Sequence, residues 1–321
     1  LSCLSLLAAA PVAAGEASRA EIHVYSALGT PRSFSVRGRV LRESPEAGER
    51  GTVSRNLRRL LDTEEWKRAP LELSVAGQKR TTRADDEGLF EVSFALEGEG
   101  LAPGAHPLVI EVPGKLKTEA TLTILAPGAL VVVSDFDDTV AVSEVTSKRK
   151  MVGVALTKDA DTQQAAPGMA ALYGCLAEQG AHFVYLSGSP VQFFPRLQGF
   201  LKKNGFPAGS MFLRKLGQDP LDGEQFKAPR LARLLAELPE SRFVFVGDSG
   251  EKDPEVYRGA RAAAGERLAA TFIRLVTDEP PDAPRFAQMR AFRDPAQVAP
   301  EAAARGLVSP ACAARLTAPA R

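Results

Sequence analysis

Residues 130–140 read Leu-Val-Val-Val-Ser-Asp-Phe-Asp-Asp-Thr-Val, and this stretch decides the fold of the chain. Its opening residues are apolar and leave no position for a solvent-facing side chain. They therefore predict a central strand of a parallel sheet that is covered on both faces. Asp135 and Asp137 follow at the carboxyl end of this strand, where ligands of such sheets bind. We expect both aspartates to lie in a ligand site.

The hydrophobic pattern after the linker Ala126-Pro-Gly128 predicts an α/β domain with a doubly wound parallel sheet at residues 127–283. Strand-like and helical stretches alternate there. The strand-like runs are 129–134, 181–186, 210–214, 242–247 and 268–276, and the helical ones are near 168–179, 191–204, 228–238 and 254–264. Residues 284–321 are rich in Pro, Ala and Arg and predict a helical or loosely ordered tail.

A different pattern precedes the linker, in residues 20–126. Short runs of alternating apolar and polar residues are separated by turn signals such as Asp85-Asp-Glu-Gly88. The runs are 34–41, 71–75, 89–96, 107–112 and 120–125. This spacing predicts an all-β, antiparallel sandwich-like domain. One helical interruption is expected near Asn56 to Trp66, with its apolar side chains in the core.

Length and composition exclude some classes of protein. A chain of 321 residues predicts about two domains. The formal net charge of +1 gives no sign of a nucleic-acid partner. Three histidines, His23, His106 and His182, are scattered without metal-ligand spacing, which argues against zinc.

Residues 1–19 are interpreted as the remnant of an export signal and a leader. Residues 1–14 are apolar, and Val12 and Ala14 suit signal-peptidase cleavage. The stretch is shorter than the ~20 residues that span a bilayer, so no transmembrane span is expected in the mature chain. The protein is then periplasmic or secreted, with Cys3 as an alternative lipid anchor. The other alternative is an Ala-rich disordered leader on a cytoplasmic protein.

Two cysteines, Cys175 and Cys312, remain after such a cleavage. They could form a disulfide in an oxidising compartment, but the sequence does not give the distance between them.

Chemistry-bearing residues follow the predicted strands in a consistent order. Asp135-Phe-Asp-Asp-Thr139 is followed by Ser187 after a second strand, Lys227 ahead of a helix, and Asp248-Ser-Gly-Glu-Lys-Asp253 after a fourth strand. Because the carboxyl ends of parallel strands meet at one edge of the sheet, these residues are expected to converge.

The four elements resemble the motifs of the haloacid dehalogenase superfamily of phosphohydrolases. A closer likeness runs from Val132 to Arg274, a little under half of the chain. It includes Lys148-Arg-Lys-Met151, Pro167-Gly-Met-Ala-Ala-Leu-Tyr173, Tyr185-Leu-Ser-Gly-Ser-Pro190, Leu213-Arg214 and Phe243-Val-Phe-Val-Gly-Asp-Ser-Gly-Glu-Lys-Asp-Pro-Glu-Val-Tyr257. This combination is similar to the catalytic domain of the fungal actin-patch phosphatidate phosphatase and its bacterial relatives. The preceding sandwich resembles the corresponding segment only loosely.

The roles of the first two aspartates follow from their chemistry and from this resemblance. Asp135 is expected to attack phosphorus and form a covalent aspartyl-phosphate, which divides one difficult displacement into two easier ones. Asp137 is expected to protonate the leaving oxygen and then to deprotonate water, a task that a raised pKa favours. Phosphatases of the superfamily carry Asp at this position, whereas its ion-pumping ATPases carry Thr.

An anionic nucleophile and an anionic phosphate require a cation between them. Asp135, Asp248 and the backbone carbonyl of Asp137 are expected to hold Mg²⁺, a hard cation that prefers oxygen ligands. Asp253 either supports the metal through its waters or caps the helix that begins at Pro254.

The substrate phosphoryl group is expected to contact Ser187, Gly188 and Lys227. The Ser187 hydroxyl and the amides of Gly188 and Ser189 would bind its oxygens at a helix start. The alternative is that Ser187 only caps that helix. Lys227 would stabilise charge on the nucleophile and the phosphoryl group; the alternative lysines are Lys202, Lys203 and Lys215.

The segment between Asp137 and Ser187 is too short for a folded cap domain, which predicts an open site. An open site suits a substrate presented at a surface. The basic run Lys148-Arg-Lys150 could contact a lipid phosphate or an anionic membrane, or could be an ordinary solvated surface. Phe193 and Phe194 could contact an acyl chain, or could pack in the core of a helix.

The expected function is a Mg²⁺-dependent phosphomonoesterase whose substrate, on resemblance alone, is a lipid phosphate such as phosphatidate. One alternative keeps the chemistry and changes the substrate to soluble phosphomonoesters or phosphoproteins outside the cytoplasm. An alternative from another class is an exported binding protein in which the α/β domain is inactive. The filled catalytic positions argue against that last alternative.

Overall fold

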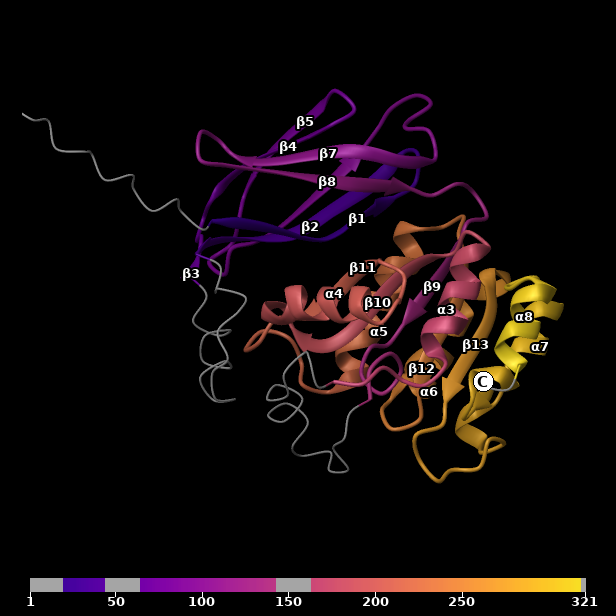
Figure 1. Ribbon diagram of the computed structural model, residues 1–321. Coiled ribbons are helices and arrows are strands. Elements are labelled where there is room, and N and C mark those ends of the chain that lie inside the picture. Colours follow the sequence, from indigo (N-terminus) through magenta and orange to yellow (C-terminus); the bar gives the residue numbers. More distant parts are fainter. Residues whose placement is uncertain (1–19, 44–63, 143–162, 319–321) are drawn as a thin grey trace, which may run out of the picture.

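Figure 1 shows the computed structural model, which describes residues 20–43, 64–142 and 163–318. The predicted leader and the basic run at 148–150 lie outside the described residues, as does most of the helix expected near Asn56. Among the described residues, no helix is both long and apolar enough to cross a membrane.

The residues after the linker form an α/β domain with a six-stranded parallel sheet at its centre, as the sequence predicts. The strands lie in the order β11-β10-β9-β12-β13-β14. Their bounds are β9 Leu130–Ser134, β10 His182–Pro190, β11 Ser210–Arg214, β12 Arg242–Asp248, β13 Leu268–Arg274 and β14 Arg290–Phe292. Between them run α3 Met169–Glu178, α4 Phe194–Lys203, α5 Gly223–Glu237 and α6 Asp253–Ala264. The alternation of strands and helices is therefore confirmed.

Strand β9 lies at the point where the strand order reverses. The chain first adds β10 and β11 on one side of β9 and then β12, β13 and β14 on the other. Val132 contributes to the apolar core beneath α3 and α4, whereas Val131 and Val133 contribute to the core beneath α5 and α6. All three valines are fully buried, which confirms the interpretation of this run as a two-face-covered strand. Such a reversal leaves a crevice at the carboxyl ends of the strands, where ligands bind.

Residues beyond 283 contain the helices expected at 284–321 and also a strand that was not expected, and these elements pack on the α/β domain. Strand β14 pairs in parallel with β13, and helices α7 Ala299–Ala304 and α8 Pro310–Thr317 pack on the same face as α3. A disulfide joins Cys312 of α8 to Cys175 of α3, with a Cα–Cα distance of 5.7 Å. The few large apolar side chains of this segment, including Phe292 and Leu307, are buried in the core and anchor it.

The described residues before the linker form one eight-stranded sheet. Its strands are β1 Glu21–Gly29, β2 Ser33–Glu43, β3 Glu64–Glu65, β4 Pro70–Val75, β5 Gln78–Arg83, β6 Leu89–Ala95, β7 Gly104–Val112 and β8 Leu116–Ile124. All pairs are antiparallel except β1 with β8. The sheet folds over so that β1 and β2 lie opposite β4, β7 and β8 (Figure 1), with Val36, Leu73 and Ile110 in the core. This sheet supports the all-β part of the prediction; its description as a sandwich stays a prediction.

The folded sheet packs against the β11 side of the α/β domain. The ring of Tyr25 lies 4.7 Å from that of Phe194, and the Ser26 hydroxyl donates to the Ser210 hydroxyl at 3.0 Å. Arg37 forms an ion pair with Glu237 at 2.5 Å. Phe194 is thus a buried contact between the two parts rather than a surface for an acyl chain.

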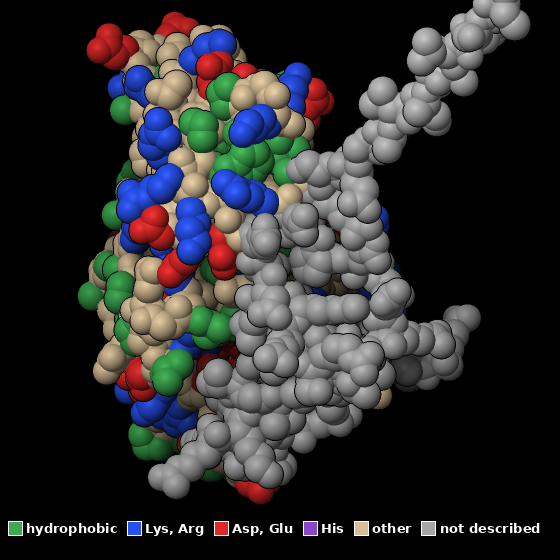
Figure 2. Space-filling view, turned by 90° about the vertical axis from the view of Figure 1, so that its left-hand side faces the viewer, with side chains coloured by type: hydrophobic (Ala, Val, Ile, Leu, Met, Phe, Trp, Pro, Cys, Tyr) green, Lys and Arg blue, Asp and Glu red, His purple; other side chains and the backbone are tan. Residues whose placement is uncertain are grey.

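Charges of both signs are mixed on the face drawn in Figure 2, outside the grey residues. Lys and Arg side chains lie among Asp and Glu there, in keeping with the formal net charge of +1.

Candidate active site

The turn after β9 carries Asp135 and Asp137 on either side of a buried anchor. The Phe136 ring is fully buried and lies 5.7 Å from the ring of Phe200. The Asp135 amide donates to the carbonyl of Val246 in β12, at 2.9 Å. The turn is therefore held between β9 and β12, at the crevice that the strand order creates.

Lys227 brings the carboxylates of three segments together. Its ammonium lies 2.6 Å from Asp135 Oδ1, 2.5 Å from Asp253 Oδ1 and 3.2 Å from Glu251 Oε2. Lys227 is buried within α5, which begins at Gly223, earlier than the expected start at 228. The Asp222 side chain caps this helix by accepting from the amide of Gln225, and the early cap places Lys227 inside the helix rather than ahead of it.

These contacts distinguish Lys227 from the other candidate lysines. Lys215 instead pairs with Asp85 of the N-terminal sheet at 3.5 Å, and Lys202 and Lys203 are exposed at the end of α4. The three N–H donors of the Lys227 ammonium each have a carboxylate within reach. A direct contact of Lys227 with a substrate phosphoryl group stays a prediction.

Asp248 ends β12 and has one engaged oxygen. Its Oδ1 accepts from the amides of Gly250 at 2.6 Å and Glu251 at 3.2 Å. The Asp248 amide donates to Asp253 Oδ2 at 3.1 Å. A Cβ on Gly247 would lie 2.5 Å from that same Asp253 oxygen, so only glycine fits this close approach.

Asp253 does not cap the helix that follows it. Helix α6 begins at Asp253 with Lys252 as its N-cap residue, and no side chain caps it. The Asp253 carboxylate turns inward instead, to Lys227 and to the Asp248 amide. The capping alternative is therefore wrong, because both carboxylate oxygens are engaged inside the site.

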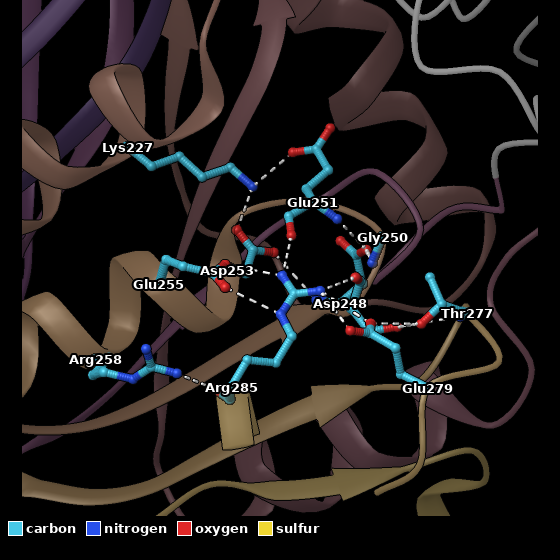
Figure 3. A network of polar contacts seen from close by, with 11 residues as sticks. Lys227, Asp248, Gly250, Glu251, Asp253, Glu255, Arg258, Thr277, Glu279 and Arg285 are labelled. Atoms are coloured by element: carbon cyan, nitrogen blue, oxygen red, sulfur yellow. Dashed lines mark hydrogen bonds and ion pairs between the residues drawn. The ribbon is translucent and has the colours of Figure 1, made fainter. Parts of the chain in front are cut away.

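Arg285 holds the loop after β12 from behind, as Figure 3 shows. Its guanidinium donates to the carbonyls of Ser249 at 3.0 Å and Glu251 at 2.8 Å. It also pairs with Glu255 at 2.9 Å and Glu279 at 3.0 Å. Arg285 lies in the segment that the sequence assigned to a tail, so its contact with this loop could not be inferred from spacing along the chain.

Burial dominates the electrostatics of the site. Burial raises the pKa of Asp135, of Asp248 and of Asp253 above the ordinary value, because each carboxylate is desolvated beside others. Burial alone would lower the pKa of Lys227, but the charges of Asp135 and Asp253 outweigh it and raise that pKa well above its usual value. Burial, reinforced by the charge of Glu251, raises the pKa of Asp137 to about 6.

The donor set fits a hard divalent cation. Asp135 Oδ2 and Asp248 Oδ2 are buried, and neither has a hydrogen-bond partner among the described residues. Carboxylate oxygens of Asp135, Asp248 and Asp253 all lie within 4.8 Å of one another. Among the described residues, the Lys227 ammonium is the one that contacts Asp135 and Asp253, so three carboxylates against this charge leave negative charge for a cation with oxygen ligands. Because both oxygens of Asp253 are engaged, Asp135 and Asp248 are the better direct ligands.

Ser187 lies beside Asp137, as the sequence predicts. Its hydroxyl donates to Asp137 Oδ2 at 3.3 Å and accepts from the Ser189 amide at 3.0 Å. Strand β10 continues to Pro190, and a 3₁₀ turn follows at Val191–Phe193. No helix begins at Gly188, so the expected helix start and the capping alternative for Ser187 are both wrong: the pairing of β10 with β11 extends as far as Pro190.

Two further residues of the site were not predicted from the sequence. Glu251, within the quoted Asp248–Asp253 motif, contacts Lys227. Arg214, at the end of β11, lies against Gly188. Arg214 belongs to the quoted likeness through Leu213-Arg214 and ends a predicted strand, and both were available signals for it.

Residues 130–275 match the model of the family described as phosphatidate phosphatase APP1, catalytic domain. The chain is 28% identical over 167 residues to phosphatidate phosphatase APP1 of Saccharomyces cerevisiae, an alignment that covers 50% of this chain and 28% of that protein. It is 26% identical over 212 residues to an uncharacterized protein of Schizosaccharomyces pombe, covering 59% of this chain and 35% of that protein. The chain thus spans about a third of the length of these relatives.

Among solved structures, the chain resembles a haloacid dehalogenase family hydrolase from Deinococcus radiodurans. That likeness has a TM-score of 0.36 and 17% identity, and covers 58% of this chain and 100% of the other. It is too weak to add to the sequence matches. The family match and the S. cerevisiae relative support the predicted phosphoric monoester hydrolase. Residues 130–275, which lie in the α/β domain with the parallel sheet, are similar in sequence to the catalytic domain of phosphatidate phosphatase APP1.

Proposed function

We propose that the chain is a Mg²⁺-dependent phosphomonoesterase that acts through an aspartyl-phosphate intermediate on a lipid phosphate such as phosphatidate. The observation that carries this proposal is the contact of the Asp135 carboxylate with the buried Lys227 ammonium at 2.6 Å, next to Asp137 and Ser187. The lipid substrate is supported by the family match over residues 130–275.

Asp135 serves as the nucleophile. One of its carboxylate oxygens forms a bond to phosphorus while the bond from phosphorus to the leaving oxygen breaks. The Lys227 ammonium favours the ionised carboxylate against the effect of burial. Bound Mg²⁺, held by Asp135 and Asp248, would neutralise charge between the carboxylate and the phosphoryl group.

Asp137 moves the protons in both steps. With its pKa raised to about 6 by burial, its protonated form is accessible near neutral pH. The leaving oxygen takes this proton and departs as the alcohol, which is diacylglycerol when the substrate is phosphatidate. The carboxylate then takes a proton from water, whose oxygen attacks phosphorus and releases inorganic phosphate from Asp135.

We also propose that the protein is exported. The disulfide between Cys175 and Cys312 supports this, because disulfides persist in oxidising compartments. Mass spectrometry of the protein from its native source, with and without reductant, would test it: a free Cys175 thiol contradicts export.

The test of the activity is phosphate release from the full chain over a panel of phosphatidate in mixed micelles and soluble phosphomonoesters, with Mg²⁺ and with chelator. Asp135→Asn should abolish turnover, whereas Asp86→Asn, which changes an exposed carboxylate, should not. Turnover that survives Asp135→Asn contradicts the mechanism. A clear preference for soluble esters contradicts the lipid substrate and favours a phosphatase of soluble phosphomonoesters or phosphoproteins. A folded wild type that hydrolyses nothing favours a binding protein.

A further inference from the structure

Arg214 is a buried cation whose donors lack acceptors. It ends β11 with only 6% of its surface exposed. Its Nε and Nη1 are buried without a hydrogen-bond partner among the described residues. A guanidinium presents five N–H donors, and an unpaired buried charge is costly unless something else compensates it.

A neighbouring arginine shows that this lack is specific to Arg214. Both Arg214 and Arg230 lie over the ring of Phe226, at 4.9 and 3.9 Å from its centre. Arg230 is satisfied, because it pairs with Asp219 at 2.7 Å and donates to the Phe226 carbonyl at 3.0 Å. The ring therefore supports two cations, of which Arg230 has a carboxylate partner and Arg214 has none among the described residues.

The guanidinium of Arg214 faces Gly188, near the carboxyl end of β10. A Cβ placed on Gly188 would lie 3.0 Å from Arg214 Nη2 and 3.8 Å from Nε. The edge formed by these two nitrogens is thus directed at the residue whose amide follows Ser187. An arginine edge of this kind matches two oxygens of a phosphate or carboxylate. Glycine at position 188 places no side chain against that edge.

Among the described residues, the carboxylates around Lys227 form no ion pair with Arg214. Glu251 is the strongest of the acidic groups that act on it, yet the Glu251 carboxylate is directed at Lys227. Lys227 itself is surrounded by carboxylates. A dianionic phosphomonoester that enters beside Ser187 would therefore meet Arg214 as a buried cation with two nitrogens that have no partner among the described residues.

We propose that Arg214 is a substrate-binding residue whose Nε and Nη2 donate to the non-bridging oxygens of a phosphomonoester, and that it selects monoesters over diesters. This inference rests on the proposed function, because it needs the phosphoryl group to lie at Ser187 and Gly188. A monoester offers three terminal oxygens to Ser187, the Gly188 amide and Arg214, whereas a diester has one fewer and carries less charge.

The test is calorimetric titration of the full chain with inorganic phosphate in the presence of Mg²⁺. Arg214→Met keeps the bulk over Phe226 and removes the charge, and we expect it to raise the Kd for phosphate roughly 10- to 100-fold. Arg214→Lys keeps the charge without the fork and should give an intermediate Kd. The matched control is Arg230→Met, which removes the satisfied arginine on the same ring and should change the Kd less than about twofold.

Hydrolysis of p-nitrophenyl phosphate and of bis-p-nitrophenyl phosphate completes the test. Arg214→Met should raise KM for the monoester and narrow the preference for monoester over diester. Equal phosphate binding by the wild type and Arg214→Met overturns the inference, as does an equal effect of Arg230→Met. If Arg214→Met does not fold, the Kd for phosphate is measured on Arg214→Lys, whose near-ultraviolet spectrum must match that of the wild type. A Kd equal to that of the wild type then overturns the inference. Ester hydrolysis that is equal in the wild type and in Asp135→Asn refutes the proposed function instead, and this result is separate from the outcome for Arg214.

Discussion

Replacing Lys227 by methionine should destabilise the metal-free protein strongly. The Lys227 side chain is 2% exposed and lies within 3.2 Å of carboxylates on Asp135, Asp253 and Glu251. Methionine fills a similar space but leaves these carboxylates buried without their counter-charge. Removal of one partner of a buried ion pair costs about 3–5 kcal/mol, so we expect a loss of that order in the free energy of unfolding at neutral pH in chelator.

The loss should depend on pH in a defined direction. The pKa of Lys227 is raised, so its stabilising contribution is complete below the ordinary lysine pKa and disappears only as pH rises through the raised value. The pKa values of Asp135 and Asp253 are also raised, by burial. These carboxylates take up protons as pH falls, which removes the uncompensated charge. The difference between wild type and Lys227→Met should therefore shrink toward low pH.

Urea unfolding, followed by near-ultraviolet circular dichroism, measures the loss in the free energy of unfolding of the α/β domain. The buried tyrosines Tyr173, Tyr185 and Tyr257 all lie around the sheet of the α/β domain. The control is Lys215→Met, because Lys215 is 36% exposed and pairs with Asp85 at 3.5 Å, a surface contact worth less than about 1 kcal/mol. Saturating Mg²⁺ should stabilise Lys227→Met more than the wild type. Equal losses in the two variants would refute the assignment of Lys227 as the counter-charge of this cluster.

Three other outcomes are expected. For an alkyl phosphate, kcat/KM should fall as pH rises above about 6, because burial raises the pKa of Asp137 to about 6 and its acid form is lost there; a pH–rate profile that keeps this slope in Asp137→Asn contradicts the role. Replacing Cys175 and Cys312 by serine together should lower the free energy of unfolding by about 2–5 kcal/mol, because the bond joins residues 137 positions apart and so restricts the unfolded chain; unchanged urea midpoints would rule this out. Arg285→Met should weaken Mg²⁺ binding roughly tenfold by loosening the loop behind Asp248, whereas Arg258→Met, beside it, should not; calorimetric titration with Mg²⁺ that gives equal affinities contradicts the positioning role.

Burial on both faces made the central strands readable in the sequence. Strands β9, β11 and β12 lie within a residue of their expected bounds, because a run of apolar residues is required wherever two layers of helices cover a sheet. Strand β5, Gln78–Arg83, was not predicted, because it contains no apolar residue and is almost wholly exposed. Pairing of its backbone with β4 holds this edge strand in place. Backbone pairing leaves no hydrophobic pattern in the sequence.

The same distinction separates the predicted from the unpredicted site residues. Asp135 and Asp137 lie in the turn just after β9, and Asp248 ends β12, so the pattern of the strand locates each side chain. Lys227 lies within a helix, and the resemblance to a family was needed to select it. Arg285 acts on the site through loop carbonyls from a short 3₁₀ turn beyond the last predicted strand. Its place depends on the packing of a segment without strong periodicity, which composition alone does not specify.

The two buried cations of the site divide its work, and this division follows from their partners. Lys227 has carboxylates for all of its donors, so it balances the charge of Asp135 and Asp253 before any substrate arrives. Arg214 has an aromatic ring and no carboxylate among the described residues, so its donors remain for an incoming anion. Loss of Lys227 should therefore appear first in stability and in the ionisation of the nucleophile. Loss of Arg214 should appear first in KM and in phosphate affinity. If replacement of Lys227 and replacement of Arg214 changed stability and phosphate affinity equally, the two cations would not have separate roles. Both would then act on the nucleophile and on the substrate.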